Sequence, residues 1–157
     1  MENLEVKLLT MMVRGAYDLQ ALRMQAGLRL CANFRAKLKM PAEASNPRVI
    51  SEPSIGSNPS DASDELSAEA VKVLDLLKAS YKRLTDGVAR NRALPAEKGF
   101  VGDELISRFS ELTLVDQYVR LESQEVLAFR QMTATLEKIP IYNEYLKGQK
   151  GIGPAMA

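Results

Sequence analysis

Gly151, Ile152, Gly153 and Pro154 form the cluster whose residue types and spacing point to a definite chemistry. Two glycines around one apolar residue let the backbone turn tightly and approach an anion closely. A helix that starts directly after such a turn presents unpaired backbone N–H groups, which attract a phosphate. The pattern therefore predicts half of a helix-hairpin-helix motif that binds the DNA backbone, with a short first helix over residues 141–147.

Two lysines and a proline support this interpretation. Lys147 and Lys150 flank the turn and would add positive charge at a phosphate without reading the base sequence. Pro154 stands where a second helix would begin, a position that proline favours. The alternative is an ordinary glycine-rich helix end followed by a tail, and the apolar Ile152 between the glycines favours the hairpin. We expect the second helix to be cut short at Ala157, one turn after it starts.

The absence of histidine removes a large class of catalytic and metal sites. Histidine is the most versatile general base near neutral pH and the commonest neutral metal ligand. Ser-His and Cys-His mechanisms are excluded, and so is the Glu-x-x-His motif of di-metal bundles. We therefore expect no enzymatic activity of the chain by itself, no metal site and no cofactor. The single cysteine, Cys31, lies in an apolar stretch and is expected to be a buried, inert thiol, with a reactive thiol as the alternative.

Residues 2–39, the first element that the sequence defines, have the periodicity of one long amphipathic helix. They contain no proline, and their apolar residues recur at helical spacing, at Leu4, Leu8, Met11, Leu19, Leu22, Ala26, Leu30, Phe34 and Leu38. Gly15 and Gly27 interrupt the pattern, and each costs about 1 kcal/mol relative to alanine. These glycines should either mark bends or let another helix approach closely.

Residues 40–66 have the composition of a flexible linker. Prolines recur at positions 41, 47, 53 and 59 among many serines, which disfavours both a helix and a central strand. The few apolar side chains cannot offset the conformational entropy lost on ordering such a segment. We expect a disordered, passive spacer, with a regulatory phosphorylation segment as the alternative.

Two further helices are predicted over residues 67–139. The first begins at Ser67 as N-cap, ends by the Leu94-Pro95 dipeptide, and carries on one face Val73, Leu77, Tyr81, Leu84 and Val88. The second begins near Asp103, since an acidic residue suits a helix start, and runs to Ile139. Pro140 disfavours its continuation. The fold class is therefore all-α.

The last of these long helices has heptads typical of a coiled coil. Its core positions are Leu105, Leu112, Val119 and Val126, alternating with Val115, Phe129 and Leu136. Arg108, Glu122 and Thr133 interrupt the seam, as polar residues that fix the register of a coiled coil do. Two interpretations stay open: a homo-oligomer paired through residues 105–136, or a helical bundle within one chain.

A nearly balanced total charge, 21 basic and 20 acidic side chains, hides a segregation along the chain. Residues 1–40 carry seven basic and three acidic groups, net +4, and 41–66 carry one and five, net −4. Residues 67–102 carry seven and four, net +3, and 103–139 carry four and seven, net −3. Opposite segments should attract, so the fold itself should satisfy much of the basic excess. The basic residues of the first helix either contact nucleic acid or form a solvated face, and they are Arg14, Arg23, Arg29, Arg35, Lys37 and Lys39.

Length and hydropathy indicate one ordinary globular domain. A chain of 157 residues, 46% of them apolar, can bury a core without disulfides. No apolar run approaches the roughly 20 residues that a membrane span needs. The N-terminal residues lack the pattern of a secretory signal, so we expect a cytoplasmic protein.

The C-terminal stretch YLKGQKGIGPAMA resembles the start of the C-terminal module of insertion-sequence transposases of the DEDD-type, serine-assisted recombinase family. The phrases YDLQALR, ASYKRLTDGVAR and GDELIS are similar to the helical front half of a subgroup of such mobile-element proteins. The resemblance implies DNA recombination guided by an element-encoded RNA, and a coiled coil that joins two modules. It also implies catalysis split between an acidic RNase-H-like domain and a downstream serine.

The chain departs from that family twice. It has no β-rich N-terminal segment for the acidic residues, and it ends before the module that would hold the serine. Only the hairpin residues 151–154 are therefore carried over, and no catalytic residue is. We expect a transposase-like DNA-binding protein or fragment with weak, non-specific affinity for DNA, and a guide RNA as a further partner. The alternative is a helical interaction module without DNA function, and salt-dependent DNA binding separates the two.

The contrast between the helical segments and the Pro/Ser segment predicts the first site of proteolysis. Limited digestion with a protease of broad specificity should cut first between Met40 and Asp64, because a linker can enter a protease active site without unfolding. Mass spectrometry of the first fragments checks this. First cleavage within residues 105–136 would contradict the assignment of these segments.

Overall fold

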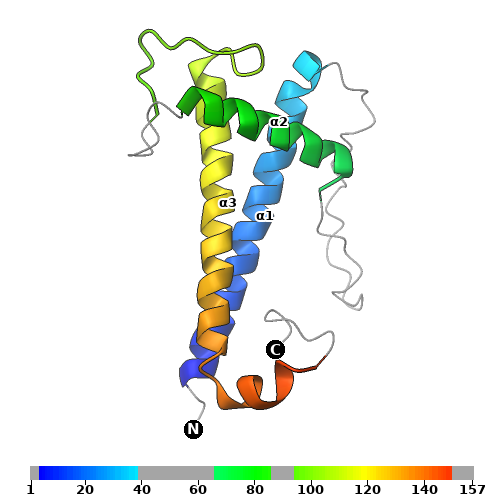
Figure 1. Ribbon diagram of the computed structural model, residues 1–157, viewed down its shortest axis with the longest axis vertical. Helices are drawn as coiled ribbons and strands as arrows, with labels where there is room; N and C mark the ends of the chain where they lie inside the picture. Colours follow the sequence, from blue (N-terminus) through cyan, green and yellow to red (C-terminus); the bar gives the residue numbers. More distant parts are fainter. Residues whose placement is uncertain (1–3, 39–65, 86–93, 150–157) are drawn as a thin grey trace. The chain divides into compact units, whose positions relative to one another are not determined.

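The computed structural model describes residues 4–38, 66–85 and 94–149. Within those ranges it contains the α-helices α1 (Leu4–Leu38), α2 (Ala68–Thr85) and α3 (Phe109–Leu136) and the short π-helix η2 (Tyr142–Leu146), but no strand (Figure 1). The all-α prediction is confirmed. The predicted linker lies outside the described residues except for Leu66, and so does Val88 of the predicted second helix.

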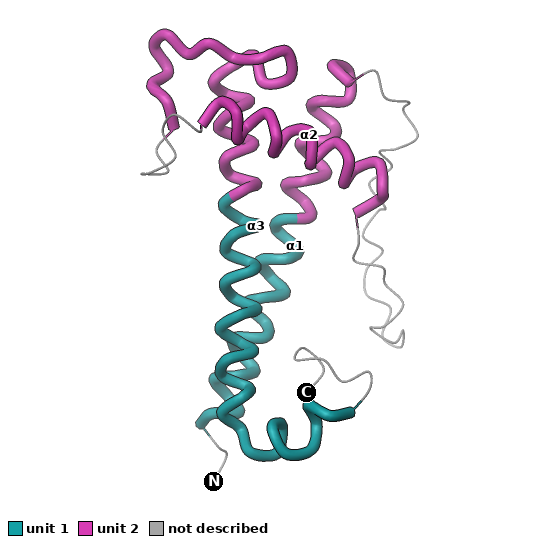
Figure 2. Tube along the Cα trace, in the orientation of Figure 1, with its two compact units in different colours: residues 1–23, 120–157 teal, residues 24–119 magenta. Residues whose placement is uncertain are grey.

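The chain divides into two compact units, coloured separately in Figure 2. Unit 1 combines residues 1–23 with 120–157, and unit 2 comprises residues 24–119. Both boundaries fall inside long helices, α1 and α3. Each unit therefore brings together segments that are far apart in the sequence.

Unit 2 holds a hydrophobic core to which all three α-helices contribute. Its buried residues are Leu30 and Phe34 of α1, Val73, Leu74 and Leu77 of α2, Leu112, Val115 and Tyr118 of α3, and Ile106 of the preceding loop. Burying one such large apolar side chain stabilises a fold by about 1.5–3 kcal/mol. The apolar periodicity predicted for residues 73–81 and 30–38 therefore faces this core.

Gly27 of α1 sets how closely the helices of unit 2 approach one another. A Cβ atom at this position would lie 3.2 Å from Leu74 Cδ1 and 3.2 Å from Tyr118 Cε2. These distances are shorter than ordinary van der Waals contact, so the side chains of Leu74 and Tyr118 would have to give way to a larger residue. Of the two predicted roles for a mid-helix glycine, Gly27 has the second, which is close approach of other helices.

Helix α2 begins as its sequence predicts. The Ser67 hydroxyl accepts a hydrogen bond from the Ala70 N–H at 3.2 Å, and the Ser67 carbonyl accepts one from the Val71 N–H at 3.0 Å. This is the geometry of an N-cap, in which a side-chain oxygen satisfies one of the unpaired donors of the first turn. Its described residues end at Thr85, and residues 86–93 of the predicted helix lie outside the described ranges.

The prediction that a helix begins at Asp103 is wrong, because α3 begins at Phe109. Asp103 Oδ1 accepts hydrogen bonds from the backbone N–H groups of Leu105 at 2.9 Å and Ile106 at 2.7 Å. A side chain that bonds its own following backbone stabilises a turn in place of a helix. The turn is tight, because a Cβ on Gly102 would lie 2.2 Å from the Ile106 carbonyl oxygen.

Glu111 organises the true start of α3. Its carboxylate accepts hydrogen bonds from the N–H groups of Ser107 at 2.9 Å and Arg108 at 3.2 Å. A glutamate in the first turn that reaches back to such donors is one half of a capping box. The ammonium of Lys37, near the end of α1, donates to the same carboxylate at 2.7 Å. Glu111 therefore fixes the α3 start and ties it to α1 at once.

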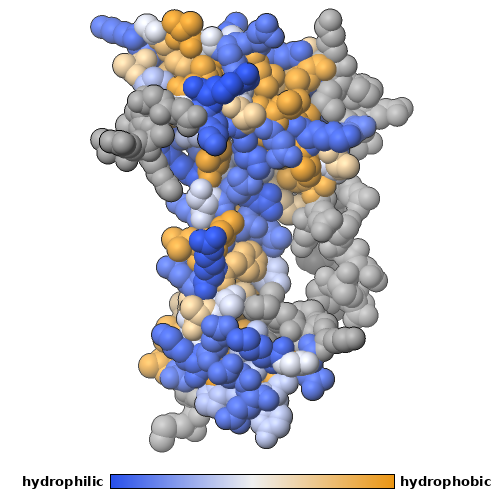
Figure 3. All heavy atoms as spheres, in the orientation of Figure 1, coloured by the Kyte–Doolittle hydropathy of each residue, from blue (hydrophilic) through white to orange (hydrophobic). Residues whose placement is uncertain are grey.

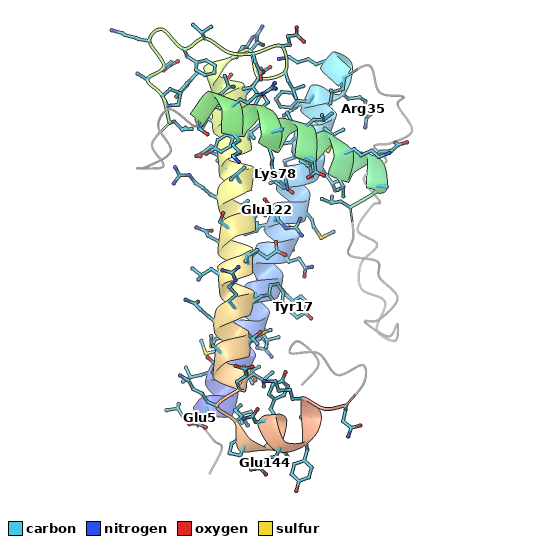
Figure 4. The ribbon with its side chains drawn as sticks, viewed as in Figure 1. Glu5, Tyr17, Arg35, Lys78, Glu122 and Glu144 are labelled. Atoms are coloured by element: carbon cyan, nitrogen blue, oxygen red, sulfur yellow. The ribbon has the colours of Figure 1, made fainter. Side chains whose placement is uncertain are left out.

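Unit 1 contains an antiparallel helix pair made of α1 up to residue 23 and α3 from residue 120. Tyr17 and Phe129 meet edge to face with ring centroids 6.0 Å apart, and Arg23 forms an ion pair with Glu125. The later residue of α1, Arg23, contacts the earlier residue of α3, Glu125, so the two helices are antiparallel. Figure 4 labels Tyr17 on α1 and Glu144 on η2 of this unit.

The predicted heptad seam of α3 is covered in part by the chain itself. Leu112 and Val115 are buried in the core of unit 2, and Leu136 is buried in unit 1. Leu105 precedes the helix, and the side chain of Val126 is 45% exposed. At Leu112, Val115 and Leu136 the seam therefore packs within one chain, as the bundle interpretation predicts. Pairing of two copies through residues 105–136 stays a prediction.

The hydrogen bonds of Asp103 predict an acid-sensitive fold. Burial raises the pKa of Asp103, but the hydrogen bonds from Ser80, Ile106 and Leu105 and the charge of Arg83 together hold it below its ordinary value. A carboxyl with a lowered folded pKa stabilises the fold above its unfolded pKa, and that contribution is lost as the pH falls through the folded pKa. We expect Asp103→Asn to lower the free energy of unfolding near neutral pH and to make it fall less steeply below about pH 4.

Urea unfolding at neutral pH and at about pH 3 measures both effects. The matched control is Glu104→Gln, which removes the same charge from the exposed neighbouring residue and should leave the pH dependence unchanged. If the Asp103→Asn variant loses stability with acid as steeply as the original chain, Asp103 does not carry the effect.

Candidate nucleic-acid interface

The predicted phosphate-binding hairpin begins at the edge of the described structure. Gly151, Ile152, Gly153, Pro154 and Lys150 lie outside the described residues, whereas Lys147 lies within them. The short helix predicted over residues 141–147 is present as the π-helix η2, and its flanking residues Ile141 and Lys147 have helical backbone angles. The Lys147 N–H donates to the Tyr142 carbonyl at 2.9 Å. A short helix is therefore present over these residues, as a π-helix, and the hairpin after it stays a prediction.

Helix η2 is fixed by one buried side chain and otherwise faces solvent. Tyr142 is buried, whereas Asn143, Glu144, Tyr145 and Lys147 are exposed. This segment follows the turn at the end of α3, where the Ile139 N–H donates to the Leu136 carbonyl at 3.0 Å. The prediction that the helix ends at Ile139 is therefore wrong by three residues. Helix α3 ends at Leu136, and a turn separates it from Pro140.

The charge of Lys147 is already partly compensated within unit 1. Its ammonium lies 2.8 Å from the Glu137 carboxylate, and both side chains are about half exposed. The hydrogen bond to Glu137, followed by the attraction between the two charges, raises the pKa of Lys147. Lys147 is therefore protonated at neutral pH, but a phosphate would have to compete with Glu137 for it.

The predicted attraction between basic and acidic segments is confirmed by three ion pairs. Arg23 donates through two nitrogens to the two carboxylate oxygens of Glu125, and Arg83 Nη2 lies 3.2 Å from Asp103 Oδ2. Lys37 pairs with Glu111 at 2.7 Å. Each pair joins a basic segment to the acidic segment 103–139. These three cations are consequently less available to nucleic acid.

The basic face predicted on α1 has few exposed cations that lack an acidic partner named above. Arg14 and Arg29 are exposed, whereas Arg23 and Lys37 point at acidic partners. Non-specific DNA binding depends on how many phosphates are neutralised by such groups. The described part of α1 therefore offers too few clustered cations to be a strong DNA-binding surface by itself.

The buried polar groups of unit 2 are structural rather than catalytic in their geometry. Ser80 is fully buried and donates its hydroxyl to Asp103, and the Tyr81 hydroxyl donates to Asp116 Oδ1 at 2.7 Å. A serine nucleophile needs an adjacent general base and an open approach for substrate, and Ser80 has no such opening. No group of three metal-ligating side chains occurs among the described residues.

A groove of about 450 Å³ runs along unit 1 on one side of α3. Two of its carboxylates are engaged already, Glu125 with Arg23 and Glu137 with Lys147. The lining residues are Glu125, Val126, Phe129, Arg130, Thr133, Ala134 and Glu137. This groove combines a hydroxyl with paired charges and offers no nucleophile with a base beside it.

Cys31 behaves as its apolar surroundings predict. Its thiol donates to the Ala70 carbonyl at 3.7 Å in unit 2. Burial raises the pKa of Cys31, although the nearby Arg35 acts in the opposite direction. A thiol with a raised pKa contains little thiolate at neutral pH and reacts slowly. The structure therefore supports the inert-thiol interpretation.

Comparison with known proteins gives no relative for this arrangement. No family model, no curated protein and no solved structure matches the chain. None of the helices in the described ranges has both the length and the apolar character needed to cross a lipid bilayer. Any functional assignment must therefore come from the residues themselves.

The ion pair of Lys147 makes a prediction about DNA affinity. Replacing Glu137 by glutamine should tighten non-specific DNA binding about two- to threefold, because a phosphate then meets no competing carboxylate at Lys147. The control is Glu144→Gln, which removes the same charge from the exposed side of η2. Fluorescence anisotropy with a labelled duplex measures both variants. An equal gain for the two would mean that only net charge matters and that Lys147 is not a DNA contact.

Proposed function

We propose that the chain is a DNA-binding helical module of a transposase-like mobile-element protein, and that it takes part in DNA recombination without catalysing it. The observation that carries this proposal is the helical turn at 141–147, fixed by the buried Tyr142, directly before the glycine-rich hairpin. A helix-hairpin-helix needs such a first helix to hold its turn in place. The proposed contacts are Gly151, Ile152, Gly153 and Pro154, with Lys147 and Lys150 beside them.

The electrostatics of the fold argue for weak binding. Arg23, Lys37 and Arg83 pair with carboxylates, so these three cations are less available to neutralise phosphates. Backbone N–H groups near Gly153 would then supply the main contact, and they read no bases. The resemblance to RNA-guided transposases adds a guide RNA as a proposed partner. The proposed location is the cytoplasm.

A second candidate function is that of a helical interaction module, and exposed apolar side chains favour it. Figure 3 shows such side chains among polar ones on the surface. In unit 1 the exposed set comprises Leu4, Val6, Leu8, Met11, Tyr17, Leu22, Val126, Leu127, Ile141 and Tyr145. Where such residues form a contiguous patch, they favour the binding of another protein. In this case the glycine-rich segment would be incidental.

A DNA titration with hairpin variants separates the two candidates. The chain should bind duplex DNA with little sequence preference and with a shallow slope of log K against log salt, about −1 to −3, as expected for one to three phosphates. Gly153→Val should abolish this binding, because a β-branched residue disfavours the turn and blocks the approach of a phosphate.

The matched control is Gly148→Val, which places the same side chain five residues upstream, where a Cβ would meet no atom within 4 Å. Binding should persist in this variant, apart from a modest loss. Equal affinities of the original chain and both valine variants would exclude the hairpin as the DNA contact and would leave the interaction module as the better assignment.

A further inference from the structure

One side of α1 in unit 1 is apolar and uncovered. Leu8, Met11 and Leu22 are 50%, 69% and 50% exposed, and they lie on the same side of the helix as Gly15. A Cβ on Gly15 would meet no atom within 4 Å. At Gly27, in contrast, side-chain atoms of Leu74 and Tyr118 lie 3.2 Å from where a Cβ would be. A mid-helix glycine costs about 1 kcal/mol, and at Gly15 nothing in the described residues uses the space that it leaves.

The chain covers a different side of this helix. Ala16 is fully buried, and Tyr17 contacts Phe129 of α3. Consecutive residues of an α-helix point about 100° apart, so Gly15 faces well away from the direction of Ala16. The side through Gly15 is therefore separate from the side that packs on α3. We call Leu8, Met11, Gly15, Leu19 and Leu22 the Gly15 face.

The Gly15 face is symmetric about its glycine. Met11 and Leu19 lie four residues before and after Gly15, and Leu8 and Leu22 lie seven before and after. Offsets of four and seven residues turn by about 40° and 20° from the direction of Gly15, so all five form one narrow stripe. A stripe with this symmetry is self-complementary when a second identical helix runs antiparallel to it.

We propose that the Gly15 face binds the same face of a second copy of this chain, with the two α1 helices antiparallel and a two-fold axis beside Gly15. Each residue before the glycine then lies opposite its counterpart after the glycine in the partner. Leu8 packs on Leu22 and Met11 on Leu19, twice each, while the two glycines let the helix backbones approach closely.

Charge complementarity supports a second copy as the occupant. Arg14 and Asp18 are both exposed and flank Gly15 on one edge of the face. In the antiparallel pair this edge of both copies lies on one side, and Arg14 of one copy is offset by about 3 Å along the helix axis from Asp18 of the other. The two-fold axis creates this pair twice. The two Arg14 side chains have the same axial offset from each other, so two attractive pairs stand against one repulsive pair. In a parallel pair the two-fold axis runs along the helices and puts this edge of the two copies on opposite sides of the interface, so no such charge pair forms.

A charge-swap series tests the pairing by sedimentation equilibrium. Arg14→Asp and Asp18→Arg should each raise the dimer dissociation constant about tenfold, because each places like charges together at two sites. The double variant should restore the original value within about twofold, since both pairs re-form with reversed polarity. Lys72→Asp, a charge reversal at an exposed site on α2, should leave association unchanged.

Two results would overturn the proposal. One is a chain that stays monomeric at high concentration with its helix content intact by circular dichroism. The other is a double variant no better than the single ones, since a general charge effect would then explain them. Met11→Glu should also abolish association, whereas Leu76→Glu, at a similarly exposed apolar site on α2, should not.

Disulfide trapping tests the orientation. In a Cys31→Ser background, a Leu8→Cys chain is mixed with a Leu22→Cys chain and oxidised gently. The antiparallel pair predicts mixed 8–22 dimers, because these positions are opposite each other. Predominant 8–8 and 22–22 dimers would show a parallel pair, and no trapping above the level of a Ser110→Cys control would show no contact here. Either result rejects the proposed interface. The proposal does not rest on DNA binding, so the valine variants of the hairpin should dimerise normally.

Discussion

The close approach of three helices at Gly27 is the constraint on which unit 2 depends. Leu74 of α2 and Tyr118 of α3 occupy the space that a side chain of α1 would otherwise fill. A glycine here lets these two side chains lie directly against the α1 backbone. One and two turns further along α1, Leu30 and Phe34 then reach the same core, and Lys37 reaches Glu111 at the start of α3. A bulkier residue at 27 would displace the side chains of Leu74 and Tyr118 at the edge of this core.

The ion pairs between the helices depend on the way the helices pack. The helices bring basic segments against the acidic segment 103–139, and the paired side chains are partly buried. A partly buried carboxylate must keep its partner, since removing one member leaves an uncompensated charge. Among the described residues, no buried side-chain polar atom lacks a hydrogen-bond partner. The charged groups therefore serve the fold first, and this lowers what they can contribute to binding nucleic acid.

The sequence was informative wherever a local rule decided the structure. Apolar periodicity predicted α1, the N-cap rule located the start of α2 at Ser67, and charge segregation predicted the long-range ion pairs. It failed at Asp103, where an acidic residue satisfies the rule for a helix start and for a turn alike. Gly102 was the overlooked signal, because its neighbour across the turn leaves no space for a Cβ. The partner of Lys147 was also unpredictable, since Glu137 lies beyond the turn at Pro140.

Two glycines of one helix show why the candidate sites were harder to predict than the fold. Gly15 and Gly27 are equivalent by sequence rules, and each was expected to mark a bend or a close approach. Only packing distinguishes them, because the chain fills the space at Gly27 and leaves the space at Gly15 open. The two surfaces proposed for binding are an apolar helix face and a backbone hairpin. Neither needs many charged side chains, so weak salt dependence is what both modes of binding should share.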